Sequence, residues 1–216
     1  MTEVAEVARE TSASLVVVGS APHSRFGHQV AGGRAAQLIR TVDCPVWSVD
    51  PHPFVAPRSA VVAVDFGRAS TRAARAALAL LEPGGTLTLL HVLPHREADR
   101  GPRDRVEVVE CAMRLRQFRD ELRPFVPQGT IVETLTISGT VSEVVRRSAE
   151  VLGADLVVVG TNGPGLVERL LVGSVAADVL HNPGMTVLAC PPDRVAKVRG
   201  SGHRAPPGIR TAPAGI

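Results

Sequence analysis

Large aromatic side chains are scarce in this sequence, which has no tyrosine, one tryptophan and 3% aromatic residues overall. Its core must therefore be built from valine, leucine and alanine, which suits a buried parallel sheet covered by alanine-rich helices. The cysteines, Cys44, Cys111 and Cys190, form no Cys-x-x-Cys pair. Their odd number and irregular spacing favour a reducing compartment over a disulfide framework.

Long apolar runs are also missing. No stretch reaches the roughly 18 residues of a membrane span, and no charged leader precedes an apolar segment. We therefore expect a soluble, cytoplasmic protein with no membrane partner.

A concentrated basic surface is absent as well. The whole chain carries a net charge of +3, but residues 193–216 alone hold five basic residues and one acidic residue. The rest of the chain is therefore close to neutral, and it shows no basic stripe interleaved with aromatic residues. We expect no nucleic-acid partner.

What the chain does contain is a repeat of itself. Residues 15–19 and 156–160 both read Leu-Val-Val-Val-Gly, and at the same offset Gly32 falls on Gly173. A match at one fixed offset over about 50 residues indicates an internal duplication.

The two copies differ in extent, because the first begins in what would be the last third of the unit. We expect residues 1–51 to be the C-terminal part of a first unit and residues 52–57 to be a proline-punctuated linker. Residues 58–192 should form a complete unit. Residues 193–216, which combine proline, glycine and arginine, should form a disordered basic tail.

In the complete unit, short apolar runs alternate with helical patterns. This alternation predicts a doubly wound, five-stranded parallel α/β sheet preceded by a partial copy of the same unit. Ser70 is the expected N-cap of the first helix. Strands are expected at 60–64, 86–92, 131–136, 156–159 and 186–190, and helices at 71–81, 106–122, 142–152 and 175–180.

A glycine-rich loop follows the fourth of these strands. It reads Gly160-Thr161-Asn162-Gly163 and, after nine further residues, Gly173-Ser174. Glycines let the backbone approach a ligand and point N–H groups at its oxygens, and a helix start adds partial positive charge. In this generic form the signal for phosphate binding is weak, and no Gly-Lys-Ser/Thr follows that would make it a Walker motif.

The spacing of this loop resembles the ATP-binding signature of the universal stress protein family, G-x2-G-x9-G-[S/T]. The resemblance implies an adenine nucleotide alpha hydrolase-like fold with strand order 3-2-1-4-5. It also implies that Asp65 sits in a nucleoside pocket and that the main chain of Val92, at the end of the second strand, meets the adenine edge. The nucleotide-binding residues it implicates are Ala63, Val64, Asp65, Val92, Gly160, Asn162, Gly163, Gly173, Ser174 and Val175.

The sequence departs from the family pattern in several places. Gly67 stands where the family usually has a serine, Asn162 is uncharged, and the loop contains no lysine. In the first copy, Pro22 replaces the second glycine and Gly33 replaces the serine, and both changes remove hydrogen-bond donors. The first copy should not bind ATP by itself.

These patterns favour an ATP-binding sensor or signalling protein of the stress response that turns ATP over inefficiently if at all. The expected cofactor is ATP, with an accompanying Mg left open, and no catalytic residue or metal site is predicted. A slow ATP-hydrolysing enzyme and an interaction module without nucleotide remain the alternatives. Beyond the nucleotide, we expect an unknown protein partner and a homodimer or intrachain pseudo-dimer in which residues 46–49 lie along 186–190.

Overall fold

The computed structural model describes residues 2–19, 33–49, 56–94, 102–161, 173–180 and 185–192. The predicted tail at 193–216 and most of the predicted linker at 52–57 lie outside these residues. The helices are α1 (Thr2–Glu10), α2 (Gly33–Thr41), α3 (Arg68–Leu80), α4 (Pro102–Glu121), α5 (Val141–Leu152) and α6 (Ser174–Leu180), with a 3-10 turn at Arg123–Phe125. The strands are β1 (Val16–Gly19), β2 (Val46–Val49), β3 (Ser59–Ala63), β4 (Thr86–Pro94), β5 (Ile131–Gly139), β6 (Leu156–Gly160) and β7 (Val187–Cys190).

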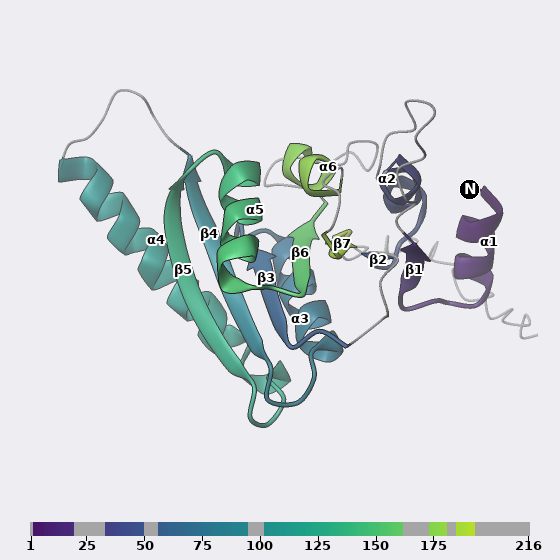
Figure 1. Cartoon of the computed structure of the whole chain (residues 1–216), viewed down its shortest axis with the longest axis horizontal. Coiled ribbons are helices and arrows are strands. Elements are labelled where there is room, and N and C mark those ends of the chain that lie inside the picture. The colour runs from purple at the N-terminus through teal and green to yellow at the C-terminus, as the bar shows by residue number, and fades with distance from the viewer. Residues whose placement is uncertain are drawn as a thin grey trace, which may run out of the picture.

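All described strands belong to one seven-stranded sheet in the order β1-β2-β7-β6-β3-β4-β5 (Figure 1). Within the complete unit, β3, β4, β5, β6 and β7 are the first to fifth strands, so the order 3-2-1-4-5 is confirmed. These five strands are mutually parallel, as expected of a doubly wound sheet.

The two copies meet where β2 runs antiparallel to β7. Val46 pairs with Ala189, Trp47 with Leu188, and Ser48 with Val187. The pairing expected between residues 46–49 and the last strand is therefore found, and it forms within the chain. Trp47, only 4% exposed, packs in the same apolar cluster as Leu188.

Helices cover both faces of the sheet, because alternate residues of the buried strands point to opposite sides. One apolar cluster joins the sheet to α3 and α4, and the other joins it to α1, α2, α5 and α6. Figure 1 shows α5 and α6 in front of the strands, with α3 and α4 behind. The alanines of α3 let it approach the sheet closely, and Ala73, Ala74 and Ala77 are completely buried.

Several element boundaries differ from those expected. β4 continues past Val92 to Pro94, and β5 continues to Gly139, because the two strands stay paired over their whole length. α4 begins at Pro102, a residue that fits the first turn of a helix because its missing N–H would have no partner there. α3 begins at Arg68 rather than after Ser70. Among the described residues, no helix has both the length and the apolar composition needed to cross a bilayer.

Deleting residues 1–57 should leave a domain that aggregates or dimerises. The deletion removes β2 and uncovers the β7 edge, with Leu188 beside it, and an unpaired apolar edge recruits other chains. Light scattering on the truncated protein tests this, and a well-behaved monomer would contradict it.

Candidate functional site

The sheet has a switch point between β3 and β6, where strand order reverses direction. The chain leaves β3 toward β4 on one side and leaves β6 toward β7 on the other, so their carboxyl ends open a crevice. Gly160 is the last residue of β6, and Asp65 follows the end of β3 by two residues. The fold therefore brings these two predicted site residues to the same edge.

Asp65 is held by the first turn of α3. Its Oδ1 accepts hydrogen bonds from the Gly67 N–H, at 2.8 Å, and from the Ser70 hydroxyl, and the Ser70 oxygen accepts the Asp65 N–H at 3.0 Å. Ser70 is 1% exposed and lies inside the helix, whose N-cap is Gly67, so its predicted capping role is wrong. Among the described residues, none donates to the second carboxylate oxygen, Oδ2.

Phe66, the residue after Asp65, packs against side chains of β4 and α4. Its ring centroid lies 4.6 Å from that of His91 and 6.3 Å from that of Phe118, and the Arg114 guanidinium carbon lies 4.2 Å above it. His91 Nδ1 lies 2.7 Å from the Val64 carbonyl oxygen. Phe66 has φ of 62°, a left-handed conformation that costs a side chain on the order of 1–3 kcal/mol and persists only where packing enforces it.

Sequence reasoning missed Phe66 and His91 as parts of this site. A signal was present, because an aromatic residue follows the acid at the end of one strand and a histidine lies in the strand beside it. Both residues hold the Asp65 loop in place from the β4 and α4 side.

Gly160 has a packing role. A Cβ at this position would lie 2.9 Å from the Ala69 Cβ and 3.4 Å from the Ser70 nitrogen. Only glycine lets the end of β6 touch the turn of α3 that holds Asp65, because a Cβ contact under 3.0 Å does not occur without movement. Ala69 and Ser70 thus link the loops that follow β3 and β6.

Hydrogen bonds hold Gly173, at the start of α6, close to Thr161, at the end of β6. The Gly173 N–H donates to the Thr161 carbonyl at 2.8 Å, and the Thr161 N–H donates to the Cys190 carbonyl at 3.0 Å. The two ends of the predicted phosphate loop are therefore tied together at the strand ends. Asn162 and Gly163 lie outside the described residues, as does the side chain of Ser174.

The remaining predicted residues lie around this crevice. Ala63 is the last residue of β3. Val64, which follows it, is buried, and its N–H donates to the Leu90 carbonyl at 2.8 Å. Val175 packs against one of the two core clusters. Val92 is not at the end of its strand as expected, since it pairs with Ile137 inside β4. Among the described residues, no group of three or more His, Cys, Asp or Glu side chains could hold a metal ion.

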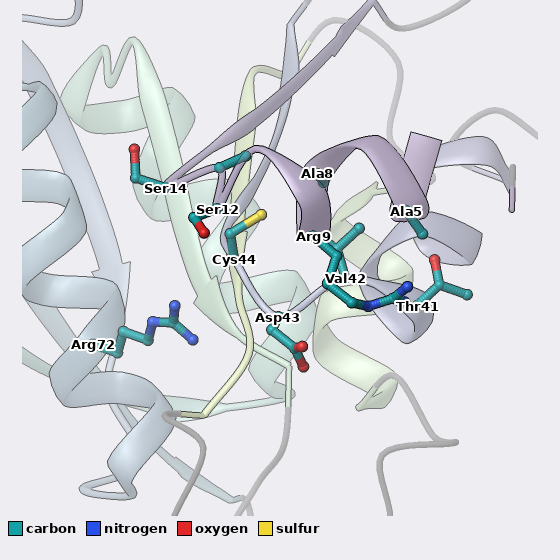
Figure 2. Close-up of a pocket in the computed structure, with 11 residues that line it drawn as sticks. Ala5, Ala8, Arg9, Ser12, Ser14, Thr41, Val42, Asp43, Cys44 and Arg72 are labelled. Atoms are coloured by element: carbon teal, nitrogen blue, oxygen red, sulfur yellow. The ribbon is translucent and has the colours of Figure 1, made fainter. Parts of the chain in front are cut away.

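Two hollows lie apart from these residues. One, of about 330 Å³, lies where the first copy meets α3, and Figure 2 shows Arg72 of α3 beside Asp43 and Cys44 from the segment before β2. The other, of about 460 Å³, lies between β5 and α5. No predicted nucleotide-binding residue lines either hollow.

The universal stress protein family model matches residues 2–50 and 57–191. The chain belongs to the universal stress protein family. Universal stress protein G of Shigella flexneri and of Escherichia coli O157:H7 are each 31% identical to it over 131 residues, which is 55% of this chain and 87% of theirs.

Solved structures show the same fold. A putative universal stress protein from Pseudomonas aeruginosa is 20% identical, with a TM-score of 0.62 over 88% of this chain and 67% of its own. A universal stress protein from Archaeoglobus fulgidus is 21% identical, with a TM-score of 0.59 over 88% of this chain and 65% of its own. The sheet of this universal stress protein therefore has the adenine nucleotide alpha hydrolase-like fold predicted from its sequence.

Ser70→Ala should lower the free energy of unfolding by about 1–3 kcal/mol, because it removes the hydroxyl that both donates to and accepts from Asp65. Ser142→Ala, in the first turn of α5, is the matched control and should change stability by about 0.5 kcal/mol or less. Urea unfolding measures both variants. Equal stability of the two would show that the Ser70 contacts contribute little.

The cysteines should react in a fixed order with a thiol reagent at pH 8. Burial raises the pKa of Cys190 to about 12, and burial also raises the pKa of Cys44. Since only the thiolate reacts, about one Cys190 thiol in 10,000 is reactive at pH 8. Burial and Glu107 raise the pKa of Cys111 as well, but its side chain is partly accessible.

We therefore expect Cys111 to react first, and Cys44 and Cys190 only after unfolding. Mass spectrometry of the labelled protein over time measures this order. Labelling of all three cysteines at one rate would contradict it.

Proposed function

We propose that this universal stress protein binds ATP at the carboxyl ends of β3 and β6 and that occupancy of the site is read by a protein partner in the stress response. The observation that carries the proposal is the convergence of Asp65 and Gly160 on Ala69 and Ser70 of α3. The Asp65 carboxylate, a hydrogen-bond acceptor, lies on one side of the switch-point crevice. The Gly160 backbone, which a ligand can approach closely, lies on the other side.

The nucleoside would lie against Asp65 and β4. Oδ1 of Asp65 is used within the chain, which leaves Oδ2 to accept a ribose hydroxyl or the adenine amine. The Leu90 carbonyl points toward β3, because it accepts the Val64 N–H. Main-chain groups of alternate residues point the same way, so those of Val92 face the space beyond the end of β3. This arrangement supports the adenine contact that the family resemblance implies.

The phosphates would lie along the segment that leaves Gly160 and returns at Gly173. In this proposal, the backbone N–H of Gly163 and the side chains of Asn162 and Ser174 supply the donors. The Gly173 N–H is held by the Thr161 carbonyl, so Gly173 contributes its lack of a side chain. The segment contains no lysine, and its one basic residue, Arg169, lies within the nine-residue spacer rather than at the glycine corners. In this proposal, binding therefore rests mainly on dipoles. Mg would arrive with the phosphates rather than in a preformed carboxylate site.

We propose binding without efficient turnover because efficient ATP hydrolysis needs groups that orient water and hold a metal-bound phosphate. The carboxylate that the described residues place at the crevice is Asp65, and the Gly67 amide and the Ser70 hydroxyl already occupy one of its oxygens. An ATP-hydrolysing enzyme and an interaction module are the competing functions. Measured turnover would favour the enzyme, and a folded protein that binds no nucleotide would favour the module.

Asp65→Asn should weaken ATP binding by about 10- to 100-fold without unfolding the protein. The amide oxygen still accepts from Gly67 and Ser70, whereas the other atom changes from an acceptor to a donor. Asp120→Asn, the same chemical change on the exposed surface of α4, is the control and should leave binding unchanged.

Isothermal titration calorimetry measures the affinity, and thermal melting verifies the fold. If Asp65→Asn binds ATP like the wild type while its melting temperature is unchanged, Asp65 does not contact the nucleotide.

A further inference from the structure

The β3–β4 ladder stops one hydrogen bond short of what its register allows. The two strands pair in parallel up to Ala63 and Leu90, and the Val64 N–H continues the pattern by donating to the Leu90 carbonyl at 2.8 Å. In a regular parallel ladder, the next hydrogen bond would join the Val92 N–H to the Val64 carbonyl. Within the part of the chain that the structure describes, no such bond forms.

A side chain takes the place of the missing bond. The Val64 carbonyl oxygen lies 2.7 Å from Nδ1 of His91. Because a carbonyl oxygen can only accept, Nδ1 carries the hydrogen and donates it. The His91 ring packs against Phe66 on the sheet face that α3 and α4 cover, whereas Val92 belongs to the apolar cluster of the opposite face. The Val64 carbonyl is therefore turned out of the ladder, toward α3 and α4.

The main chain of Val92 is left free by this exchange. The Leu90 carbonyl faces β3, and main-chain groups alternate in direction along a strand, so the N–H and C=O of Val92 also face the β3 side. Neither group has a hydrogen-bond partner among the described residues. Together they offer a donor beside an acceptor, which complements N1 and the 6-amino group of adenine. Hypoxanthine, the base of ITP, presents the reverse pattern.

We propose that His91 is a positioning residue that holds the Val64 carbonyl away from the Val92 N–H and so keeps a main-chain donor open for the base. This role belongs to the ATP site proposed above and rests on that proposed function. Val64 is only 4% exposed, and a buried carbonyl without a partner is unfavourable. Without the His91 donor, the Val64 carbonyl would therefore capture the Val92 N–H, and the ladder would close over the edge that reads the base.

His91 makes two contacts that substitutions can separate. One is the hydrogen bond from Nδ1, and the other is the packing on Phe66, whose ring centroid lies 4.6 Å away. His91→Phe keeps an aromatic ring against Phe66 but removes the donor. His91→Asn removes the ring but keeps a donor, because the asparagine amide nitrogen is bonded to Cγ as Nδ1 of histidine is. A purely structural role of the ring predicts that His91→Asn is the more damaging change, and the proposed role predicts the opposite.

The first test compares these two variants in titrations with ATP and with ITP by isothermal titration calorimetry. We expect the wild type to bind ATP about tenfold or more tightly than ITP. His91→Phe should bind ATP about tenfold more weakly and ITP about as before, because only ATP uses the Val92 N–H. His91→Asn should retain most of the preference for ATP. If His91→Phe does not fold, His91→Leu removes the donor in the same way.

Hydrogen exchange of the unliganded protein tests the same contact without nucleotide. The Val92 amide should exchange about tenfold or more faster in the wild type than in His91→Phe, where it joins the ladder. The Leu90 amide, which lies within the ladder, is the internal reference. If the wild type binds no ATP, the proposed function is wrong, and the exchange rates alone decide whether His91 holds the Val64 carbonyl.

Three results would overturn the role of His91. The first is a Val92 amide that is as protected in the unliganded wild type as in His91→Phe. The second is an ATP-binding wild type that binds ITP equally well, or a His91→Phe variant that keeps the preference for ATP. The third is a His91→Asn variant that loses this preference as fully as His91→Phe.

Discussion

The antiparallel pairing of β2 with β7 joins the two copies into one sheet and covers the edge of the last strand of the complete unit. β7 is completely buried from Leu188 to Cys190, with β2 along one edge, β6 along the other and helices α3 and α6 packed against it. β6 in turn carries Gly160 to the crevice. β1 and β2 thus extend the sheet beyond β7 and cover an edge that would otherwise be unpaired.

The candidate site is organised by one turn of helix rather than by its loops. Ala69 packs so closely against Gly160, at the end of β6, that residue 160 has no room for a side chain. Ser70 both donates a hydrogen bond to Asp65 and accepts one from it. Phe66, packed against His91, prevents the intervening loop from relaxing. The result is a preorganised edge in which packing and hydrogen bonding fix the same few atoms.

The doubly wound class and the two copies were predictable from long patterns, namely alternating apolar runs and a repeat at one offset. The strand order and the pairing of residues 46–49 with the last strand were implied by the family resemblance. The details that failed are tertiary. Ser70 resembles an N-cap in sequence, but its hydroxyl finds a better partner in Asp65 once β3 and α3 are packed. β4 runs past Val92 because β5 stays paired with it, which no local propensity reveals. The left-handed Phe66 follows from a pocket formed by β4 and α4, remote in sequence.

The order in which the sheet can assemble during synthesis follows from the β2–β7 pairing. β2 leaves the ribosome before its partner β7, which is made about 140 residues later, a delay of roughly 7–28 s at the usual rate of translation. Throughout that interval Trp47 and the β2 edge have no β7 to cover them. The nascent chain therefore exposes an unpaired apolar strand throughout that interval, and such strands are prone to pair with other chains.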